Sequence, residues 1–341
     1  MKISLILPSY RHTYSAIARI MEWSTLDPAK FELIVRDNSQ NKEKCDILSK
    51  LVSPTLKLHT VENCNPFENA IAAFREASGD FILSVGDDDW LSIRGLQQLH
   101  AITEQYSLDT SIACVTGNYL LESTATSYMF RYGPLDSKEP HQRISNYLQA
   151  NASNFLYYSV VRRSLATLCF EFLEHLPYRF SYHDQLISLI YLSLGRVIQI
   201  ERVVYGYDLG EWETAENTLS KDRSMYVAAG LPVEYDRLHH FFCALEGALL
   251  LDSNYILDKV AGDTGASADL WFQTMFSKFV HHQRDLPENG SASDKATTKL
   301  RQKLLTQKDW NFSELLLDAC DVIEVADPAG AQRYFNFWST L

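Results

Sequence analysis

Short apolar runs alternate with amphipathic segments along the first 105 residues of the chain. The apolar runs, which are the expected strands, cover residues 3–7, 31–35, 56–61 and 81–85. Segments with apolar positions at helical spacing follow them, at residues 14–25, 42–52, 65–77 and 93–105. Strands of a parallel sheet that is covered on both faces are apolar in this way, and helices connect them. The pattern therefore predicts an α/β fold with a doubly wound, mostly parallel sheet and helices on both faces.

The pattern changes after about residue 110. Strands are expected at residues 112–119, 156–161 and 197–205, and helices at 164–173 and 184–194. Residues 123–140 carry glycine, proline and turn residues, which favours a loop or an antiparallel excursion. Helical spacing dominates from about residue 222 onward, at 234–251, 268–282, 297–305 and 313–323. We therefore expect an α-helical C-terminal region.

The composition limits the classes of partner. The 341 residues carry 31 Lys and Arg against 43 Asp and Glu, so the basic face that nucleic acids require is not expected. No pair of the six cysteines has metal-ligand or redox spacing, which is typical of reduced thiols in a cytoplasmic protein. No apolar run approaches the roughly 20 residues of a membrane helix, and the apolar start is too short for a signal peptide. We expect a cytoplasmic protein that contacts a membrane at most peripherally.

Several polar motifs come directly after the expected strands. Residues Pro8–Tyr10 follow the first strand, Asp37 follows the second and Asp87–Asp89 follow the fourth. Doubly wound sheets bind ligands outside the carboxyl ends of their strands, so these motifs are expected at one edge. If the strand breaks at Gly86, the three carboxylates can fan around one point. Divalent cations with diphosphates are held by carboxylates in this way, although an acidic surface turn is the alternative.

The ordered set of motifs resembles family 2 of the GT-A glycosyltransferases. The set consists of a strand with Pro-Ser-Tyr, a strand with Asp-Asn-Ser, and Ala-Ser-Gly-Asp-Phe before the strand that leads into Asp-Asp-Asp-Trp. The resemblance covers roughly the first third of the chain, continues weakly to about Tyr207 and is absent beyond. It implies a GT-A-type domain with a nucleotide-sugar-binding half at residues 1–115 and an acceptor-binding half at 116–222. The helical C-terminal region at 223–341 follows.

The resemblance also implies which residues bind the donor nucleotide. They are Pro8, Ser9, Tyr10, Asp37, Asn69 and Asp87. Tyr10 would stack on a uracil ring, and Asp37 would accept a hydrogen bond from the base. Asp87 would lie near the ribose.

The chain departs from the family at positions that often contact the donor. The family often has Arg-Asn-x-Gly in the helix before Ala-x-Gly, and the matching positions hold Ala70, Ile71 and Ala73. A diphosphate or ribose contact is therefore missing or comes from elsewhere, with Arg75 and Arg162 as candidates. The first Asp of the family's base motif is replaced by Arg36.

The resemblance implies a metal cofactor, Mg²⁺ or Mn²⁺, that bridges to the donor diphosphate. Asp88 would bind the cation. The triplet can be aligned in two registers, so Asp89 is a rival ligand. The family often has a further His ligand after the last strand, where Asp208 or Glu211 would have to substitute, or one carboxylate would have to suffice.

Asp184 is the candidate general base. Residues 181–197 resemble the family's later segment, in which an acidic residue opens a helix that ends at a Gly before a strand. The alternative interpretation is a helix cap, because Asp is a favoured capping residue and apolar residues follow at helical spacing. Both roles are compatible, since a place at the helix start fixes the direction of the side chain.

The expected reaction is inverting, metal-dependent transfer of a sugar from a nucleotide diphosphate sugar, with a UDP-sugar favoured. The acceptor would be a saccharide or a lipid-linked saccharide, in the assembly of a bacterial surface polysaccharide. A sugar-nucleotide pyrophosphorylase and a non-catalytic, degenerate transferase scaffold are the alternatives. A basic stretch between Lys295 and Lys308 is typical of a solvated helix face, and contact with anionic lipid headgroups is the other interpretation.

Overall fold

The computed structural model describes residues 1–62, 64–123, 126–212, 214–258, 265–282, 288–307 and 309–341. The chain forms two compact units. The first comprises Met1–Asp136, Asn154–Glu174 and Gly195–Gly210, and the second comprises Ser137–Ser153, His175–Leu194 and Glu211–Leu341. This division differs from the expected boundaries after residues 115 and 222. The reason is that helices from 137–153 and 175–194 pack on helices of the C-terminal region.

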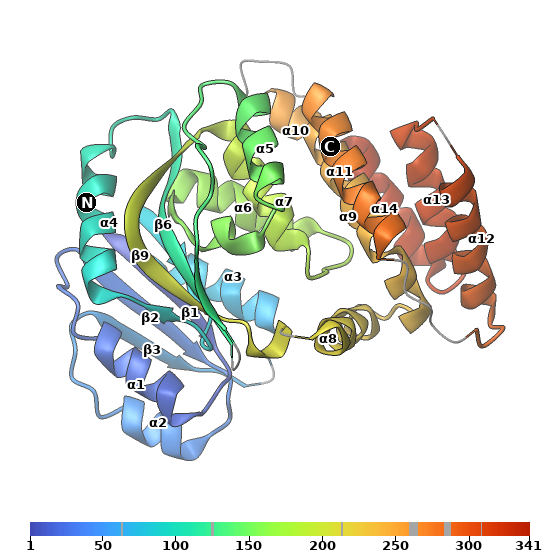
Figure 1. Cartoon of the computed structure of the whole chain (residues 1–341). Helices are drawn as coiled ribbons and strands as arrows, with labels where there is room; N and C mark the ends of the chain where they lie inside the picture. Colours follow the sequence, from blue (N-terminus) through green and yellow to red (C-terminus); the bar gives the residue numbers. More distant parts are fainter. Residues whose placement is uncertain (63, 124–125, 213, 259–264, 283–287, 308) are drawn as a thin grey trace. The chain divides into compact units, whose positions relative to one another are not determined.

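A mixed sheet forms the centre of the first unit (Figure 1). Its strands follow one another in the order β3 (Leu56–Thr60), β2 (Phe31–Asp37), β1 (Ile3–Ser9), β4 (Phe81–Ser84), β8 (Val160–Arg162), β6 (Ile112–Glu122), β9 (Arg196–Asp208) and β5 (Trp90–Leu91), and β7 (Ser127–Phe130) pairs with β6. The long pairings, among β1 to β4 and between β6 and β9, are parallel. The short strands β5, β7 and β8 pair antiparallel. The expected α/β class with a mostly parallel sheet is confirmed.

Helices follow the strands along the chain and lie on both faces of the sheet. They are α1 (Tyr14–Trp23), α2 (Lys42–Leu48), α3 (Pro66–Glu76), α4 (Ile93–Gln105) and α6 (Arg163–His175). The start of α3 shows why the sequence folds this way locally. The Asn65 side chain accepts a hydrogen bond from the Glu68 N–H at 2.9 Å, and Pro66 occupies the first helical position.

One expected element of the first unit comes out differently, and an alternative left open for another is decided. The strand expected at 156–161 is mainly a 3-10 helix, η1 (Asn154–Tyr158), and only β8 is extended there. The segment 123–140 contains the antiparallel excursion, one of the two expected alternatives, because β7 returns along β6 as a hairpin, with residues 124–125 outside the described part. The short strand β8 was harder to place, because its partners β4 and β6 are distant in sequence.

The amino ends of the strands are held by a buried carboxylate. Glu32 on β2 accepts hydrogen bonds from the Ser78 hydroxyl at 2.7 Å, the Gly79 N–H at 2.9 Å and the Lys57 ammonium at 2.7 Å. Burial raises the pKa of Glu32, but the bonds from Lys57, Ser4 and Ser78 outweigh burial and lower the pKa to about 2. A Cβ at Gly79 would lie 2.6 Å from the Ser4 hydroxyl. The Ala-Ser-Gly-Asp motif is therefore a packing motif at this end of the sheet.

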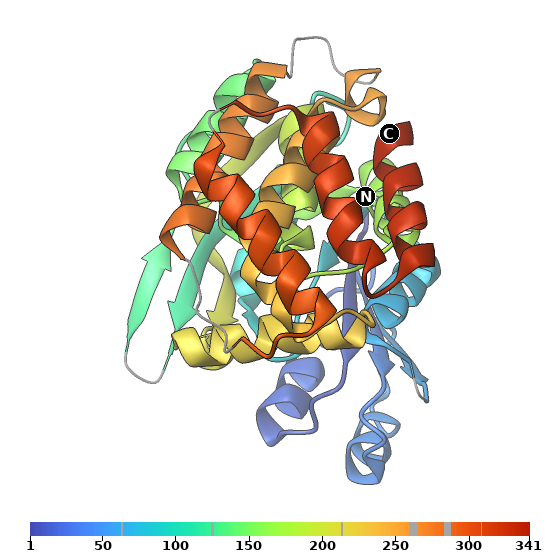
Figure 2. The ribbon, with the colours of Figure 1, turned by 90° about the vertical axis from the view of Figure 1, so that its right-hand side faces the viewer.

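The second unit is helical (Figure 2). It contains α5 (Pro140–Gln149), α7 (His183–Leu194), α8 (Ala215–Ala228), η3 (Val233–Leu238), α9 (His239–Leu251), α10 (Asn254–Leu257), α11 (Gly265–His281), α12 (Ala292–Thr306), α13 (Phe312–Glu324) and α14 (Pro328–Thr340), and η2 (Gly210–Trp212) precedes α8. The helix α9 is apolar almost all round, as expected for a helix in a core, and Phe241, Leu245 and Leu250 on it have no exposed surface. The expected helical C-terminal region is confirmed.

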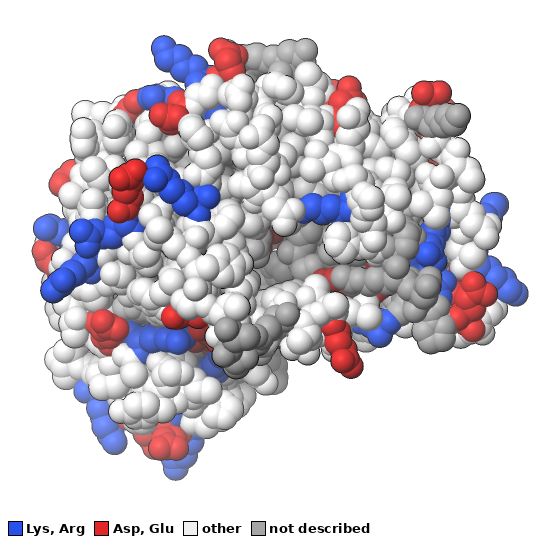
Figure 3. All heavy atoms as spheres, in the orientation of Figure 1, with Lys and Arg blue, Asp and Glu red and all other residues white. Residues whose placement is uncertain are grey.

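The surface carries charges of both signs. On the face drawn in Figure 3, Lys and Arg side chains lie interspersed with Asp and Glu. The basic stretch of the sequence falls on α12, where Lys303 forms an ion pair with Asp318 at 2.6 Å, and Lys308 lies outside the described residues. No helix in the described ranges is long and apolar enough to cross a membrane.

Candidate functional site

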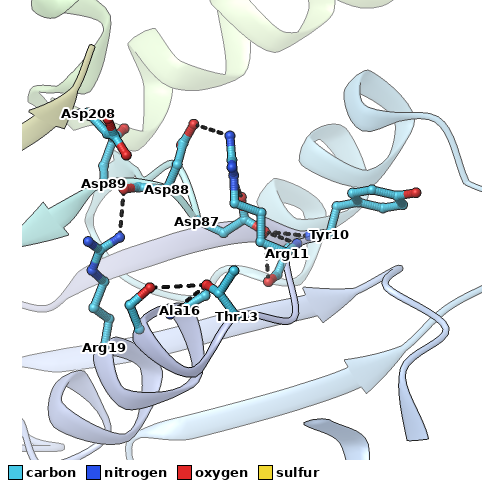
Figure 4. Close-up of polar contacts among 12 residues, drawn as sticks. Tyr10, Arg11, Thr13, Ala16, Arg19, Asp87, Asp88, Asp89 and Asp208 are labelled. Carbon is cyan, nitrogen blue, oxygen red and sulfur yellow. Dashed lines mark hydrogen bonds and ion pairs between the residues drawn. The ribbon is translucent and has the colours of Figure 1, made fainter. Parts of the chain in front are cut away.

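The candidate site is the carboxyl edge of β1, β2 and β4 together with the loops that follow, which we name the rim. In the pairing of β1 with β2, Ser9 lies opposite Asp37, so both strands end at the same level. The neighbouring strand β4 ends at Ser84, shortly before Gly86. The β1–α1 loop and the Asp triplet therefore meet at one edge (Figure 4), as the alternation of strands and helices predicted.

Asp87 fastens the β1–α1 loop. Its Oδ2 accepts hydrogen bonds from the backbone N–H groups of Tyr10 and Arg11, both at 2.6 Å, and from the Ser9 hydroxyl at 3.2 Å. Charge-assisted hydrogen bonds to successive backbone amides are strong and fix the path of the loop. The geometry thus gives Asp87 a positioning function, and its expected contact with a ribose stays a prediction.

Asp88 lies between two guanidinium groups. Its Oδ2 accepts a hydrogen bond from Arg11 Nη2 at 2.9 Å, and its backbone carbonyl accepts one from Arg19 Nη1 at 2.6 Å (Figure 4). The side chains of Arg11 and Asp88 are each 32% exposed. Asp88 is therefore the member of the triplet whose carboxylate a ligand from solution can reach most easily.

Asp89 points inward and is 2% exposed. Its Oδ2 accepts a hydrogen bond from the Tyr205 hydroxyl at 2.7 Å, and its Oδ1 accepts one from the Asp208 N–H at 3.1 Å. Burial, and after it the nearby Asp88 carboxylate, raise the pKa of Asp89 to about 7. The carboxylate thus ties the triplet to the end of β9.

The triplet does not converge on one point, contrary to the expectation from the sequence. The strand does end before Gly86, but Asp89 then binds Tyr205 and the Asp208 N–H, whereas Asp87 and Asp88 both lie beside Arg11 (Figure 4). A Cβ at Gly86 would lie 2.6 Å from Asp89 Oδ2 and 2.8 Å from Asp88 Oδ1. The glycine is therefore required for the tight turn, which leaves one oxygen of Asp88 and one of Asp89 beside the same point, while Asp87 faces the β1–α1 loop.

A buried ion pair lies beneath the β1–α1 loop. The ammonium of Lys44, which has no exposed surface, donates to Asp37 Oδ1 at 2.8 Å, to the Ser9 hydroxyl at 2.7 Å and to the Arg11 carbonyl at 2.7 Å. Asp37 is 1% exposed and also accepts a hydrogen bond from the Ser39 N–H. Lys44 thereby joins the ends of β1 and β2 to the loop. To accept the expected hydrogen bond from a base, this carboxylate would have to take a further donor in addition to Lys44 and Ser39.

Asn69 faces Arg36. Its Nδ2 donates to the Arg36 carbonyl at 2.9 Å, and its Oδ1 accepts a hydrogen bond from Arg36 Nε at 3.1 Å. Arg36 also forms an ion pair with Glu76. Asn69 is 2% exposed, so its amide holds the end of β2, and its expected contact with the donor stays a prediction.

Tyr10 is the exposed aromatic residue of the rim. It is 70% exposed, and its ring points away from the carboxylates, whereas its backbone N–H is fixed by Asp87 (Figure 4). Pro8 is half-buried at the end of β1, and Ser9 is buried. A planar ligand can stack on the Tyr10 ring without displacing protein atoms.

The carboxylates of the rim fit a divalent cation only in part. Among the described residues, no group of three or more His, Cys, Asp or Glu side chains could hold a metal ion. Magnesium ions are commonly bound by one or two carboxylates together with phosphates of a substrate and water. Asp88 can be such a carboxylate, whereas both oxygens of Asp89 already accept hydrogen bonds. The residues therefore fit a cation that Asp88 binds together with the phosphates of a ligand.

The comparisons with known proteins concern the fold. No family model matches the sequence, and the search of curated proteins finds no match either. Among solved structures, the chain is similar to S. aureus TarS 1-349, with a TM-score of 0.53, 14% identity and coverage of 100% of this chain and 91% of that chain. The same protein in complex with UDP-GlcNAc has a TM-score of 0.57 at the same identity and coverage.

The fold is of the GT-A type. At 14% identity the similarity concerns the architecture, and residue roles have to come from the geometry. The GT-A-type sheet lies within the first unit, and Asp184 belongs to the second unit, where it is the second residue of α7. It stands in the first turn of the helix and is half-buried. Its assignment as general base stays a prediction.

The GT-A-type rim contains functional groups that the sequence analysis missed. Arg11, Arg19 and Lys44 are among them, and their partners follow only from the fold: Arg11 binds the Asp88 carboxylate, Arg19 binds the Asp88 carbonyl, and Lys44 binds Asp37. Arg162, by contrast, was a candidate for the diphosphate. Its guanidinium instead donates to the backbone carbonyls of residues 106, 107 and 109. A signal for Arg11 was available, since it directly follows the Pro-Ser-Tyr motif.

Proposed function

We propose that the chain is a glycosyltransferase that moves a sugar from a nucleotide diphosphate sugar to an acceptor hydroxyl. The observation that carries the proposal is the rim of a GT-A-type sheet on which an exposed Tyr10, the carboxylate of Asp88 and the guanidinium groups of Arg11 and Arg19 lie together. Such a group of side chains can stack a base and hold a charged diphosphate. The similarity in fold to TarS 1-349 with UDP-GlcNAc supports a UDP-sugar as the donor.

The donor would bind with its base on the Tyr10 ring and its diphosphate at Asp88. A divalent cation, Mg²⁺ or Mn²⁺, would supply Lewis-acid charge to the leaving diphosphate when it is bound. Asp88 would hold it, with Asp89 as the second candidate ligand. The fixed β1–α1 loop orients Tyr10, because Asp87 accepts hydrogen bonds from the backbone N–H groups of Tyr10 and of the next residue, Arg11.

The transfer would proceed with inversion. The acceptor oxygen forms a bond to the anomeric carbon while the bond from that carbon to the phosphate oxygen breaks. The electron pair stays on the diphosphate, and Asp184 accepts the proton of the acceptor hydroxyl. A positioned general base typically contributes about 10²- to 10⁴-fold to the rate.

We propose that the acceptor is a saccharide or a lipid-linked saccharide of a bacterial surface polysaccharide. The reaction would take place in the cytoplasm, in part at the membrane surface. The exposed lysines of α12, among them Lys295 and Lys299, support contact with anionic headgroups.

Product analysis tests the proposal. The purified chain is incubated with UDP-, GDP- and dTDP-sugars with and without Mn²⁺ and saccharide acceptors, and the released nucleotides are separated. Release of a nucleoside diphosphate that depends on an acceptor supports transfer. Triphosphate formed from sugar nucleotide and pyrophosphate would identify a pyrophosphorylase. If no product forms and no sugar nucleotide binds, the result would favour a non-catalytic scaffold.

The role of Asp184 has its own test. Asp184→Asn should keep the affinity for the donor and lose about 10²- to 10⁴-fold in turnover, since it removes only the base. The matched control is Asp269→Asn, which changes an exposed Asp on α11 of the same unit. Full turnover of Asp184→Asn would exclude the assignment.

A further inference from the structure

Arg11 stands between the loop that carries Tyr10 and the carboxylate of Asp88. Its backbone is fixed, because its N–H donates to Asp87 Oδ2 and its carbonyl accepts from the Lys44 ammonium. Its guanidinium forms an ion pair with Asp88 at 2.9 Å and lies 3.7 Å from Asp87 Oδ1. Arg11 therefore has a fixed backbone and a long side chain that is 32% exposed.

This ion pair conflicts with a cation on the same carboxylate. A divalent ion binds carboxylate oxygens at about 2.0–2.1 Å, so it and the guanidinium would lie within a few ångströms of each other on Asp88. Like charges at that separation repel strongly in a partly buried site. Asp89 offers no easy alternative, since it is 2% exposed and both of its oxygens accept hydrogen bonds. The repulsion favours a cation on Asp88 when the guanidinium moves away.

The displaced guanidinium would have a new partner in the donor. The planar fork of arginine binds phosphate oxygens in pairs, and a diphosphate that shares the cation with Asp88 lies within reach of residue 11. Arg19 adds a second guanidinium beside the same residue, through its bond to the Asp88 carbonyl at 2.6 Å. Without a diphosphate, displacement costs Arg11 its ion pair and provides no replacement.

We propose that Arg11 exchanges partners during donor binding. It pairs with Asp88 when no donor is bound and with the donor diphosphate when one is bound, so that cation and diphosphate bind cooperatively. This inference rests on the proposed function, because it takes the diphosphate of a nucleotide as the second partner. It assigns Arg11 as the residue that couples the two ligands.

Binding of Mn²⁺ alone and with UDP tests the exchange. Free Mn²⁺ is measured by its electron paramagnetic resonance signal in titrations of the full chain, with and without saturating UDP. The proteins are the wild type, Arg11→Gln, and the control Arg131→Gln, which changes an arginine of the same unit that is 52% exposed and pairs with Glu201. Coupling between two ligands of one protein is typically about 5- to 150-fold.

The wild type and Arg131→Gln should bind Mn²⁺ about tenfold or more tightly when UDP is present, a coupling within the usual range. Arg11→Gln should bind Mn²⁺ alone about five- to tenfold more tightly than the wild type, and UDP should add clearly less affinity than it adds in the wild type. If Arg11→Gln binds Mn²⁺ alone no better than the wild type, or keeps the wild-type coupling, the inference is overturned. Failure of the proposed function looks different: UDP then leaves the Mn²⁺ affinity of all three proteins unchanged and does not bind.

Discussion

The substitution Lys44→Met tests the construction of the rim most directly. It removes an ammonium group from a position without exposed surface and keeps an unbranched side chain of similar length. Asp37, 1% exposed, then loses its cation, and the Ser9 hydroxyl and the Arg11 carbonyl lose a donor. The expected result is a large loss of stability in the first unit.

The magnitude follows from the burial of the pair. Breaking a buried ion pair by removing one partner typically costs about 3–5 kcal/mol, because the other charge stays buried and uncompensated. Domains are typically stable by only about 5–15 kcal/mol, so the loss is a substantial share. The double variant Lys44→Met/Asp37→Asn leaves no buried charge and should recover about 2–3 kcal/mol of the loss, since removing both partners is much less costly.

Urea denaturation measures the loss, and amide hydrogen exchange of peptides from β1 and β2 assigns it to the first unit. The matched control is Lys42→Met, which changes an exposed lysine of the same helix and should stay within about 0.5 kcal/mol of the wild type. A wild-type urea midpoint for Lys44→Met would refute the reasoning. A double variant as unstable as Lys44→Met would refute the electrostatic cause.

Three further outcomes are expected. Gly86→Ala should destabilise the first unit by about 1–3 kcal/mol in urea denaturation, because the added Cβ would lie 2.6 Å from Asp89 Oδ2; a neutral effect would show that the turn can relax. Stability should also fall as the pH drops from 4.5 toward 2, because the folded-state pKa of Glu32 is about 2, below its ordinary 4.5. The loss is at most about 3 kcal/mol, and solvent around Lys57, which is 44% exposed, reduces it. Glu32→Gln should flatten this pH dependence. An unchanged profile in that variant would show that Glu32 is not the titrating group. Tyr10→Ala should weaken UDP binding in calorimetry by about 0.5–1.5 kcal/mol while Tyr10→Phe should not, and equal losses in both would argue against stacking.

Local patterns in the sequence were sufficient to predict the elements that bring the rim together. The apolar runs fixed where β1, β2 and β4 lie, and right-handed crossovers through helices leave little choice about which ends meet. The start of α3 was predictable because Asn65 and Pro66 act within one turn of the helix. The edge at which the motifs gather could therefore be predicted without coordinates.

The partners within the rim could not be predicted, because they depend on pairs that are distant in sequence. Asp89 is bound by Tyr205, which is 116 residues away and sits on a strand whose length was underestimated. Lys44 looks like any lysine of a polar helix, and only its neighbours in space show that it is buried. Three adjacent aspartates look equivalent in the sequence, yet the turn at Gly86 gives each a different environment.

The charges of the rim support the proposal that a cation and a diphosphate bind together. Beside the Arg36–Glu76 pair, four carboxylates and three cationic side chains take part in its hydrogen bonds, namely Asp37, Asp87, Asp88, Asp89, Arg11, Arg19 and Lys44. These charges balance to within one unit before any ligand arrives. A dication alone would disturb this balance and face two guanidinium groups, whereas a dication with a diphosphate adds little net charge. The same arrangement that makes Asp88 a poor site for a lone ion thus makes it a suitable site for an ion that arrives with its phosphates.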